Sequence, residues 1–349
     1  MIKITDKTNC CGCNACVQCC PKQCITMIPD EEGFDYPTVN KNDCIDCGLC
    51  EKVCPILNSG ESKRPLKVYA AKNTKEEIRL KSSSGGVFTA LAEDIIHKGG
   101  VVFGVSFDKE WNVVHTYTEN IEGLAAFRGS KYVQSKVGSS YKEVKSFLKS
   151  GREVLFTGTS CQIAGLKNFL RKDYPNLLTI EILCHGVPSP KVWQQYLFEK
   201  KAQFRCNDIS QINFRDKRNG WSQFHMVINF TNGNLYTAPF SNDTYFKGFL
   251  SNLYLRPSCY SCKCKNGRAN SDLVIADYWN INEALPEYND NKGISLVLIN
   301  SPKGLSTINS LSTQIDYKET GYEVCRSRNG GFLEHIPIHQ YFGKFLPIN

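Results

Sequence analysis

The fold of the N-terminal part of the chain is predicted by two stretches, CCGCNACVQCCP (residues 10–21) and CIDCGLCEKVCP (residues 44–55). Each has four cysteines spaced C-x2-C-x2-C-x3-C and followed by proline. A cubane iron–sulfur cluster needs four converging thiolates, and the fourth cysteine of such a run ligates the other cluster. The spacing predicts two [4Fe–4S] clusters, one on Cys10, Cys13, Cys16 and Cys54 and the other on Cys44, Cys47, Cys50 and Cys20.

Zinc knuckles or disulfides are the alternative interpretation of these cysteines. The repeated spacing argues against it, because zinc sites use two separated cysteine pairs. The repeat resembles bacterial two-cluster ferredoxins, which move single electrons and do no chemistry on substrates. We expect residues 1–57 to form this domain. Residues 58–66 contain polar, structure-breaking NSGESKRP and should be a linker. Residues 67–349 should form a second, larger domain.

The amino-acid composition indicates the kind of cellular compartment in which the protein is expected. The 349 residues include 18 cysteines, which in a secreted protein would suggest disulfides. The first residues, MIKITDKTNC, have no apolar segment typical of a signal peptide. No apolar run approaches the roughly 18 residues of a membrane span. Thiolate clusters suit a reducing compartment, so we expect a cytoplasmic protein with no membrane span.

The formal net charge of +8 is unevenly distributed. Residues 1–60 hold five Lys and eight Asp or Glu, so the basic excess belongs to the remainder of the chain. A cubane with four thiolates carries about −2 when oxidised, so bound clusters would bring the protein close to neutrality. We therefore expect no nucleic-acid partner. The basic remainder could instead receive an acidic electron carrier or an anionic cofactor.

From Lys67 onward, short apolar runs alternate with amphipathic segments. This pattern predicts an α/β or α+β fold, here a large mixed α/β domain after the small ferredoxin-like one. Strands are expected at 101–105, 154–156, 178–183, 273–276 and 296–299, with a hairpin of 226–230 and 235–238 around Thr-Asn-Gly-Asn. Helices are expected at 87–96, 163–170 and 190–202.

Four further cysteines fall where α/β folds build their sites. Cys161 and Cys184 follow predicted strands, and Cys259 and Cys262 form a C-x2-C pair. Together they could hold a third cubane. Structural cysteines, half of a zinc site or a redox pair are the alternatives. The remaining six are expected to be packed small residues, with Cys264 the one alternative ligand: Cys11, Cys19, Cys24, Cys206, Cys264 and Cys325.

Other polar residues are candidates for binding or catalysis. Residues 82–86 (SSSGG) open a helix, where serines can cap, glycines let a ligand approach, and free N–H groups favour a phosphate. An ordinary capped helix is the alternative. Lys131 could contact a phosphate or a reduced flavin, and His185 could donate a proton. Asp277 ends a predicted strand. Each could equally be structural or a surface residue.

Six motifs follow the cysteine repeat in order: KSSSGGVFTALA, RGSKYVQS, FTGTSCQIAGLK, CHGVPSPKVWQQYL, FRDKRNGW and RPSCYSCK with SDLVIADYWNI. In this order they resemble the family of coenzyme F420 hydrogenase/dehydrogenase beta subunits over nearly the whole chain. The resemblance implies FAD and at least one [4Fe–4S] cluster in the large domain. It marks Cys161, Cys184, Cys259 and Cys262 as ligands of that cluster. Its flavin candidates are Ser83, Ser84, Gly85, Gly86, Ser130, Lys131, Tyr132, Thr157, Gly158 and Thr159.

One position departs from the family pattern. Ser160 stands where the family often has proline before the cysteine, which frees one backbone angle without abolishing the predicted cluster.

The predicted function is an iron–sulfur flavoprotein oxidoreductase. Clusters take one electron at a time, and flavin joins them to two-electron chemistry on a small-molecule substrate. Ferredoxin or another redox protein is the expected partner, and the substrate could be F420 or another compound. Lys131, His185 and Asp277 are the catalytic candidates. Two alternatives stay open: a non-catalytic electron-transfer subunit of a hydrogenase or dehydrogenase, and a ferredoxin fused to a flavin-free binding domain. The chain could act as a homo-oligomer or within a complex.

Overall fold

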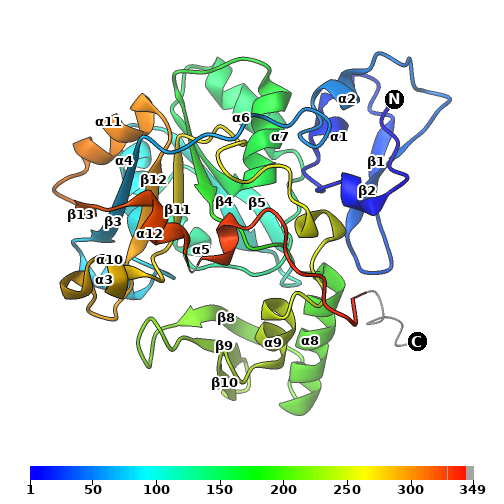
Figure 1. Ribbon diagram of the computed structural model, residues 1–349. Coiled ribbons are helices and arrows are strands. Elements are labelled where there is room, and N and C mark those ends of the chain that lie inside the picture. The colour runs from blue at the N-terminus through cyan, green and yellow to red at the C-terminus, as the bar shows by residue number, and fades with distance from the viewer. Residues whose placement is uncertain (328, 343–349) are drawn as a thin grey trace.

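A computed structural model describes residues 1–327 and 329–342 of the chain. The first 57 residues form a small unit at one side of the molecule, coloured blue in Figure 1 and called the head below. An antiparallel hairpin and short helices build it. Its elements are η1 (Lys7–Asn9), α1 (Ala15–Cys19), β1 (Ile25–Pro29), β2 (Asp35–Val39) and α2 (Leu49–Lys52).

The rest of the chain is organised around an eight-stranded mixed sheet. Neighbouring strands β4, β6, β7 and β11 run parallel, so their carboxyl ends share one edge of the sheet. In spatial order the strands are β13 (Ile315–Glu319), β3 (Lys67–Asn73), β12 (Ser295–Ile299), β11 (Leu273–Asp277), β7 (Leu177–Ile182), β6 (Val154–Thr159), β4 (Val101–Phe107) and β5 (Val113–Thr118).

Helices cover both faces of the sheet. One face packs against α6 (Ser140–Lys149) and α7 (Ser160–Leu170), and the cysteines of the head join the same apolar core. The other packs against α4 (Val87–His97), α5 (Leu124–Phe127) and α11 (Pro302–Ser310). Shorter helices are α3 (Glu76–Leu80), α10 (Ile281–Ala284), η3 (Pro286–Tyr288), α12 (Tyr322–Arg326) and η4 (Gly330–Phe332). The head is therefore packed onto the large unit through a shared core.

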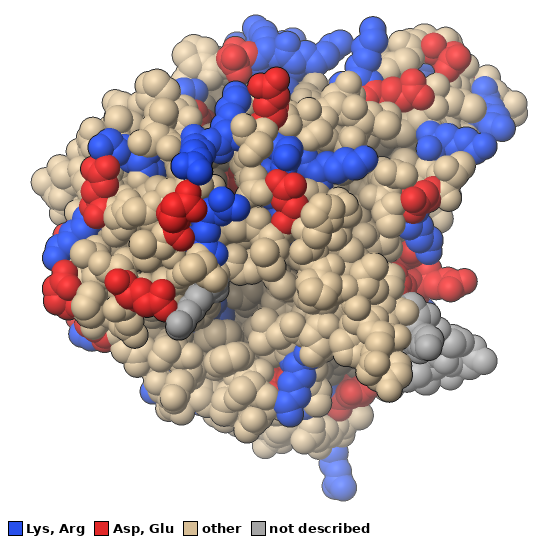
Figure 2. Space-filling model, viewed as in Figure 1, with Lys and Arg blue, Asp and Glu red and all other residues tan. Residues whose placement is uncertain are grey.

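A third apolar core lies beside the carboxyl edge of the sheet, in the lower part of Figure 1. It fills the space between a three-stranded antiparallel sheet and two helices. Its elements are α8 (Pro190–Gln203), β8 (Ile209–Asp216), β9 (His225–Phe230), β10 (Leu235–Pro239), α9 (Thr244–Leu250) and η2 (Pro257–Tyr260). The space-filling view shows a recess between this part and the large sheet (Figure 2).

The predicted fold class is confirmed: a small ferredoxin-like unit precedes a mixed α/β unit. Each strand and helix expected from apolar runs is present, with ends moved by a few residues. Strands β3 and β8 were not predicted, nor were helix α6 and the edge strands β5 and β13, whose solvent-facing sides dilute the apolar signal. None of the helices in the described part of the chain has the length and apolar character needed to cross a bilayer.

Candidate metal and cofactor sites

The two cysteine loops have the same backbone shape. The residues on each side of the second cysteine adopt left-handed conformations, Gly12 and Asn14 in the first loop and Asp46 and Gly48 in the second. Glycine, asparagine and aspartate are the residues that tolerate this conformation best. Successive turns of this kind aim backbone N–H groups into a concavity that suits an anion. Each loop can thus wrap an anionic cluster.

The outer cysteine set consists of Cys20, Cys44, Cys47 and Cys50. These four side chains line one cavity of the head, although Cys20 comes from the first loop and the others from the second. Cys47 is exposed and only Cys50 is buried. The backbone N–H of Ile2 donates to Cys50 Sγ at 3.2 Å. The crossed ligand assignment requires such a cavity, so the donor set fits a [4Fe–4S] cluster near the protein surface.

The inner cysteine set consists of Cys10, Cys13, Cys16 and Cys54, all of them buried. Burial raises the pKa of Cys16, and nearby negative charge on Cys10 and Cys54 raises it further. The sulfurs of both loops therefore lie close together here too. A Cβ added at Gly165 of α7 would lie 3.0 Å from Cys13 Sγ, so the large unit packs directly on this set.

Arg256 connects the inner set to the large unit. Its buried guanidinium donates from Nε to the Cys10 carbonyl at 2.7 Å and from Nη2 to Cys10 Sγ at 3.5 Å. It also donates to the Asp35 carbonyl at 2.9 Å and lies 4.4 Å from the Tyr36 ring centre. A buried charge needs such partners, and a cluster carrying about −2 would supply another.

A third cavity brings together Cys161, Cys184, Cys259 and Cys262, the four predicted ligands of a further cluster. They come from the start of α7, the segment after β7, and η2 with the residues after it. We call them the third cysteine set. Cys264, which the sequence left open as an alternative ligand, and Cys11, for which it suggested a packing role, line the same cavity. A hydrogen bond with Cys264 lowers the pKa of Cys262 to about 6. Six thiols around one cavity fit a cluster with four ligands.

Cys11 lies between the inner set and the third cysteine set. Its thiol interacts with Cys13 on one side and with Cys161 on the other. The outer, inner and third sets therefore follow one another from the head into the large unit. No spacing rule identified Cys11, because it is the extra cysteine between two motif positions.

Ser160, the departure from the family pattern, is buried and donates to Glu181 Oε1 at 2.5 Å. Ser271 donates to the other oxygen of the same carboxyl at 3.0 Å. Burial raises the pKa of Glu181 to about 7. The serine thus satisfies a buried acid beside the start of α7, which a proline could not do.

Several predicted flavin residues meet at the junction of the large sheet and β8. The N–H of Ser130 donates to Ser83 Oγ at 2.7 Å. Arg215 donates to Tyr132 Oη at 2.9 Å, and pairs with Asp277 at 2.7 Å. In the sequence, Arg215 lies within the motif FRDKRNGW and was not among the predicted site residues. We call this the Arg215 junction.

Arg215 carries an unpaired donor at this junction. The side chain is buried, and its Nε has no hydrogen-bond partner among the described residues. Its other nitrogens donate to Asp277 and Tyr132, and the centre of the Phe224 ring lies 4.0 Å from the guanidinium carbon. A buried donor without a partner is costly, so a bound acceptor would remove that cost. This donor fits a flavin, which offers carbonyl oxygens and ring nitrogens as acceptors.

Lys131 and Lys217 are lysines held by backbone carbonyls near this junction. Lys131 donates to the Arg128 and Gly129 carbonyls, both at 3.3 Å, and burial lowers its pKa to about 7. Lys217 donates to the Ser84 carbonyl at 2.7 Å, and burial lowers its pKa to about 7 as well. Either amine can hold or release a proton near neutral pH.

The serines and glycines of residues 82–86 have packing roles. Ser84 donates to the Ile294 carbonyl at 2.7 Å, and no serine side chain caps α4, whose N-cap is Gly86. A Cβ at Gly85 would collide with the Ala71 carbonyl, so strand packing requires glycine there. The expected serine cap is therefore wrong: Ser82 donates to the Ile78 carbonyl of α3, and the hydroxyl of Ser83 accepts from Ser130 N–H.

Four other predicted site residues lie outside the Arg215 junction: Thr157, Gly158, Thr159 and His185. Thr157 donates to the Phe103 carbonyl inside the sheet, and Gly158 packs on Gln162. Thr159 caps α7 and lines the third cavity, as does His185. The His185 ring packs on Phe249, which packs on Tyr132. His185 therefore connects the third cysteine set to the Arg215 junction.

Three family models match the chain in order. The 4Fe-4S dicluster domain matches residues 9–57. The two models for the beta subunit of coenzyme F420 hydrogenase/dehydrogenase match residues 68–142 with the N-terminal part and 151–323 with the C terminus. The fold, the cysteine sets and the three family-model matches together identify an iron–sulfur protein of an oxidoreductase family. The chain belongs to the family of coenzyme F420 hydrogenase/dehydrogenase beta subunits, with an N-terminal 4Fe-4S dicluster domain, which confirms the family prediction.

Individual relatives agree with this assignment. The chain is 22% identical over 343 residues to a subunit of the F(420)H(2) dehydrogenase of Methanosarcina mazei, covering 91% of this chain and 92% of that protein. Its head is 39% identical over 46 residues to Ferredoxin-1 of Caulobacter vibrioides, covering 12% of this chain and 41% of that ferredoxin. A chain of the F420-reducing [NiFe] hydrogenase complex from Methanosarcina barkeri shares the fold, with a TM-score of 0.52 and 19% identity over 74% of this chain and 83% of that one.

Proposed function

We propose that this protein is an iron–sulfur flavoprotein oxidoreductase that passes electrons between its head and a flavin in the large unit. The proposal assigns one [4Fe–4S] cluster each to the outer, inner and third cysteine sets. FAD, when bound, would supply the exchange between one-electron transfer and two-electron, hydride-type chemistry. The observation that carries the proposal is the succession of three cysteine sets, with Cys11, next to the inner-set ligand Cys10, lining the third cavity together with Cys161.

The residues of the Arg215 junction have defined parts in this proposal. Arg215 would donate from Nε to an acceptor atom of the flavin, while Asp277 keeps the guanidinium charged and oriented at 2.7 Å. Lys131, with its pKa lowered to about 7 by burial, would hold or release the proton that accompanies two-electron chemistry. His185 and Phe249 would form the packed contact between the third set and Tyr132.

Native mass spectrometry of the chain purified without oxygen tests the proposal. We expect a mass excess that matches three cubanes and one FAD. Two cubanes with no flavin would overturn it and leave a ferredoxin fused to a binding domain. Cys161→Ser should remove one cluster and stop the reduction of flavin through the head. Flavin reduction that survives this substitution would contradict a path through the third set.

A second candidate is a non-catalytic electron-transfer subunit. The names of the relatives favour it, because one is a subunit of a dehydrogenase and another belongs to a hydrogenase complex. Steady turnover of coenzyme F420, or of another small acceptor, by the isolated chain would exclude this role. Reduction of the bound centres without turnover would support it. Coenzyme F420 is the first substrate to assay because both relatives are named for it.

A further inference from the structure

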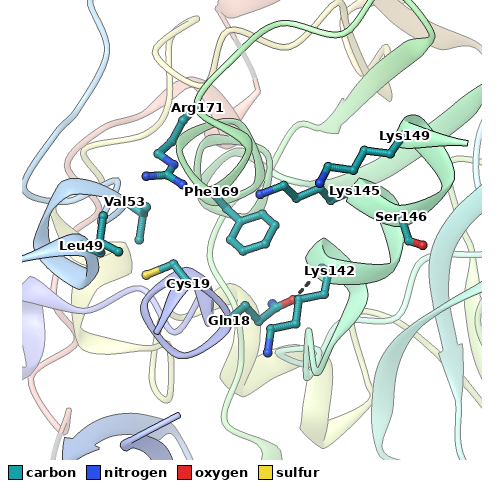
Figure 3. A pocket seen from close by; sticks show the side chains of 10 residues that line it. All are labelled: Gln18, Cys19, Leu49, Val53, Lys142, Lys145, Ser146, Lys149, Phe169 and Arg171. Carbon is teal, nitrogen blue, oxygen red and sulfur yellow. Dashed lines mark hydrogen bonds between the residues drawn. The ribbon is translucent and has the colours of Figure 1, made fainter. Parts of the chain in front are cut away.

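A cleft of about 430 Å³ separates the head from helix α6 and the end of α7. Helices α1 and α2 of the head form one wall, and α6 forms the other (Figures 1 and 3). The lining side chains are Gln18, Cys19, Leu49, Val53, Lys142, Lys145, Ser146, Lys149, Phe169 and Arg171. The proposed function uses none of them.

The cleft is strongly basic. Lys142, Lys145 and Lys149 recur at helical spacing, so they share one face of α6, and Arg171 joins them from the end of α7. No acidic side chain is among the lining residues, and none of these four cations has an ion-pair partner in residues 1–327 and 329–342. Figure 2 shows Lys and Arg side chains gathered along the upper edge, where Figure 1 has α6.

This charge arrangement costs the free protein stability. Like charges four residues apart on a helix, such as Lys145 and Lys149, repel each other. Burial, and then the positive charges of Lys149, Arg171 and Lys172, lower the pKa of Lys145. An acidic partner would relieve the repulsion.

The floor of the cleft is apolar and contains one unpaired donor. In Figure 3, Phe169 lies between Arg171 and Lys145, and Leu49 and Val53 lie on the head side of the cleft, at α2. Gln18 is 6% exposed, and its Nε2 has no hydrogen-bond partner among the described residues. Its Oε1 is already bound by the N–H of Lys142 at 3.1 Å. An apolar centre inside a charged rim is the anatomy of a protein interface more than of a site for a small anion.

The cleft is adjacent to the outer cysteine set. Leu49 lines both the cleft and the cavity that holds Cys20, Cys44, Cys47 and Cys50. Cys19, the residue before Cys20, also lines the cleft. A protein bound there would therefore lie next to the most exposed cluster position of the head.

We propose that this cleft is the docking site of an acidic iron–sulfur protein that exchanges single electrons with the outer cysteine set. The inference rests on the proposed function only in taking the head clusters as electron carriers. In the direction tested below, the partner's cluster loses one electron and the outer cluster gains it, with no bond or proton transferred. The large unit supplies the basic rim and the head supplies the acceptor.

The test compares charge reversals on and off the cleft in the holoprotein under anaerobic conditions. Lys142 and Lys149 are exposed, so Lys142→Glu/Lys149→Glu should fold normally. Exposed Lys109 and Lys247 give the control Lys109→Glu/Lys247→Glu, with the same change in net charge. Stopped-flow bleaching of the iron–sulfur absorbance is followed after mixing with a reduced, acidic two-cluster ferredoxin. Lys145→Gln provides a milder variant with one charge removed.

We expect the cleft variant to slow this reduction at least about tenfold at low ionic strength, and the control to leave it within about twofold. Salt should slow the wild type and affect the cleft variant much less. Equal rates in the cleft and control variants would overturn the docking proposal. Dithionite, a small reductant, should reduce all variants alike. Since the readout is cluster absorbance, it remains valid if no flavin is bound, so failure of the proposed function is recognised separately.

Discussion

The two cysteine loops have identical spacing and similar backbone shape but opposite surroundings. The inner set is buried beneath α7 and held by Arg256, whereas the outer set includes the exposed Cys47 and borders the basic cleft. Local sequence thus builds two equivalent ligand loops, and the body on which they rest makes them different. The buried set is suited to pass electrons inward, and the exposed set to exchange them with a partner.

The largest difference between the two sets is expected when the crossed ligand of each is replaced in turn. Cys54→Ser should remove about four iron atoms and abolish electron flow from the head into the large unit, because the inner set lies between them. Cys20→Ser should also remove about four iron atoms. It should slow reduction by ferredoxin while dithionite still reduces the remaining centres. Iron analysis and stopped-flow spectroscopy measure both effects, and identical behaviour of the two variants would contradict the assigned order.

Arg256→Gln should affect only the buried side. The substitution leaves the Cys10 and Asp35 carbonyls without their donor and removes a positive charge beside Cys10. We expect the free energy of unfolding to fall by about 3 kcal/mol and the inner cluster to become harder to reduce. A redox titration followed by electron paramagnetic resonance should show one cluster potential shifted and the other unchanged. The control is Arg152→Gln, which removes a partly exposed arginine paired with Glu119. Equal shifts in both clusters would disprove a local role.

Two glycine substitutions sharpen the same contrast. Gly165→Ala places a Cβ 3.0 Å from both Cys13 Sγ and Tyr141 Oη, so we expect a loss of about 2 kcal/mol through overpacking of the inner set. Gly48→Ala in the outer loop meets no atom within 4 Å but keeps a φ of +69°, so it should cost about 1 kcal/mol through backbone strain. Thermal unfolding under anaerobic conditions measures both. A larger effect at Gly48 would show that loop strain outweighs packing.

The core shared with the inner set should also respond to acid. His115 stacks on Phe156 and bonds Ser135 and the Thr157 carbonyl, and burial lowers its pKa from 6.5 to about 4. The folded state therefore favours neutral His115, and its stability falls as the pH drops from about 6.5 toward 4. At pH 5.5 the loss is about 1.4 kcal/mol relative to neutral pH.

His115→Gln should remove that part of the pH dependence. Unfolding midpoints at pH 7.5 and 5.5, measured for wild type and variant, give the comparison. The variant's midpoint should change less between the two pH values than the wild type's. An unchanged pH dependence in the variant would show that other groups cause it.

Sequence patterns predicted much of this molecule where the signal is local. The spacing of the eight head cysteines gave the dicluster domain, and ordered short motifs gave the family. Buried parallel strands such as β6 and β7 were predicted because their apolar runs are continuous. Helix α6 was not predicted because its polar face, which carries three lysines, dilutes the apolar signal of buried Tyr141, Val144 and Leu148.

The sequence by itself determined the ligand loops, since left-handed turns and cysteine spacing are properties of a few consecutive residues. Only the tertiary structure decided that Cys11 lies between two cysteine sets, that Arg256 reaches back to Cys10, and that Arg215 meets Tyr132 and Asp277. It also decided that the lysines of α6 face the head. Such contacts join residues far apart in the chain, and no local pattern records them because packing of the folded body alone sets their distances.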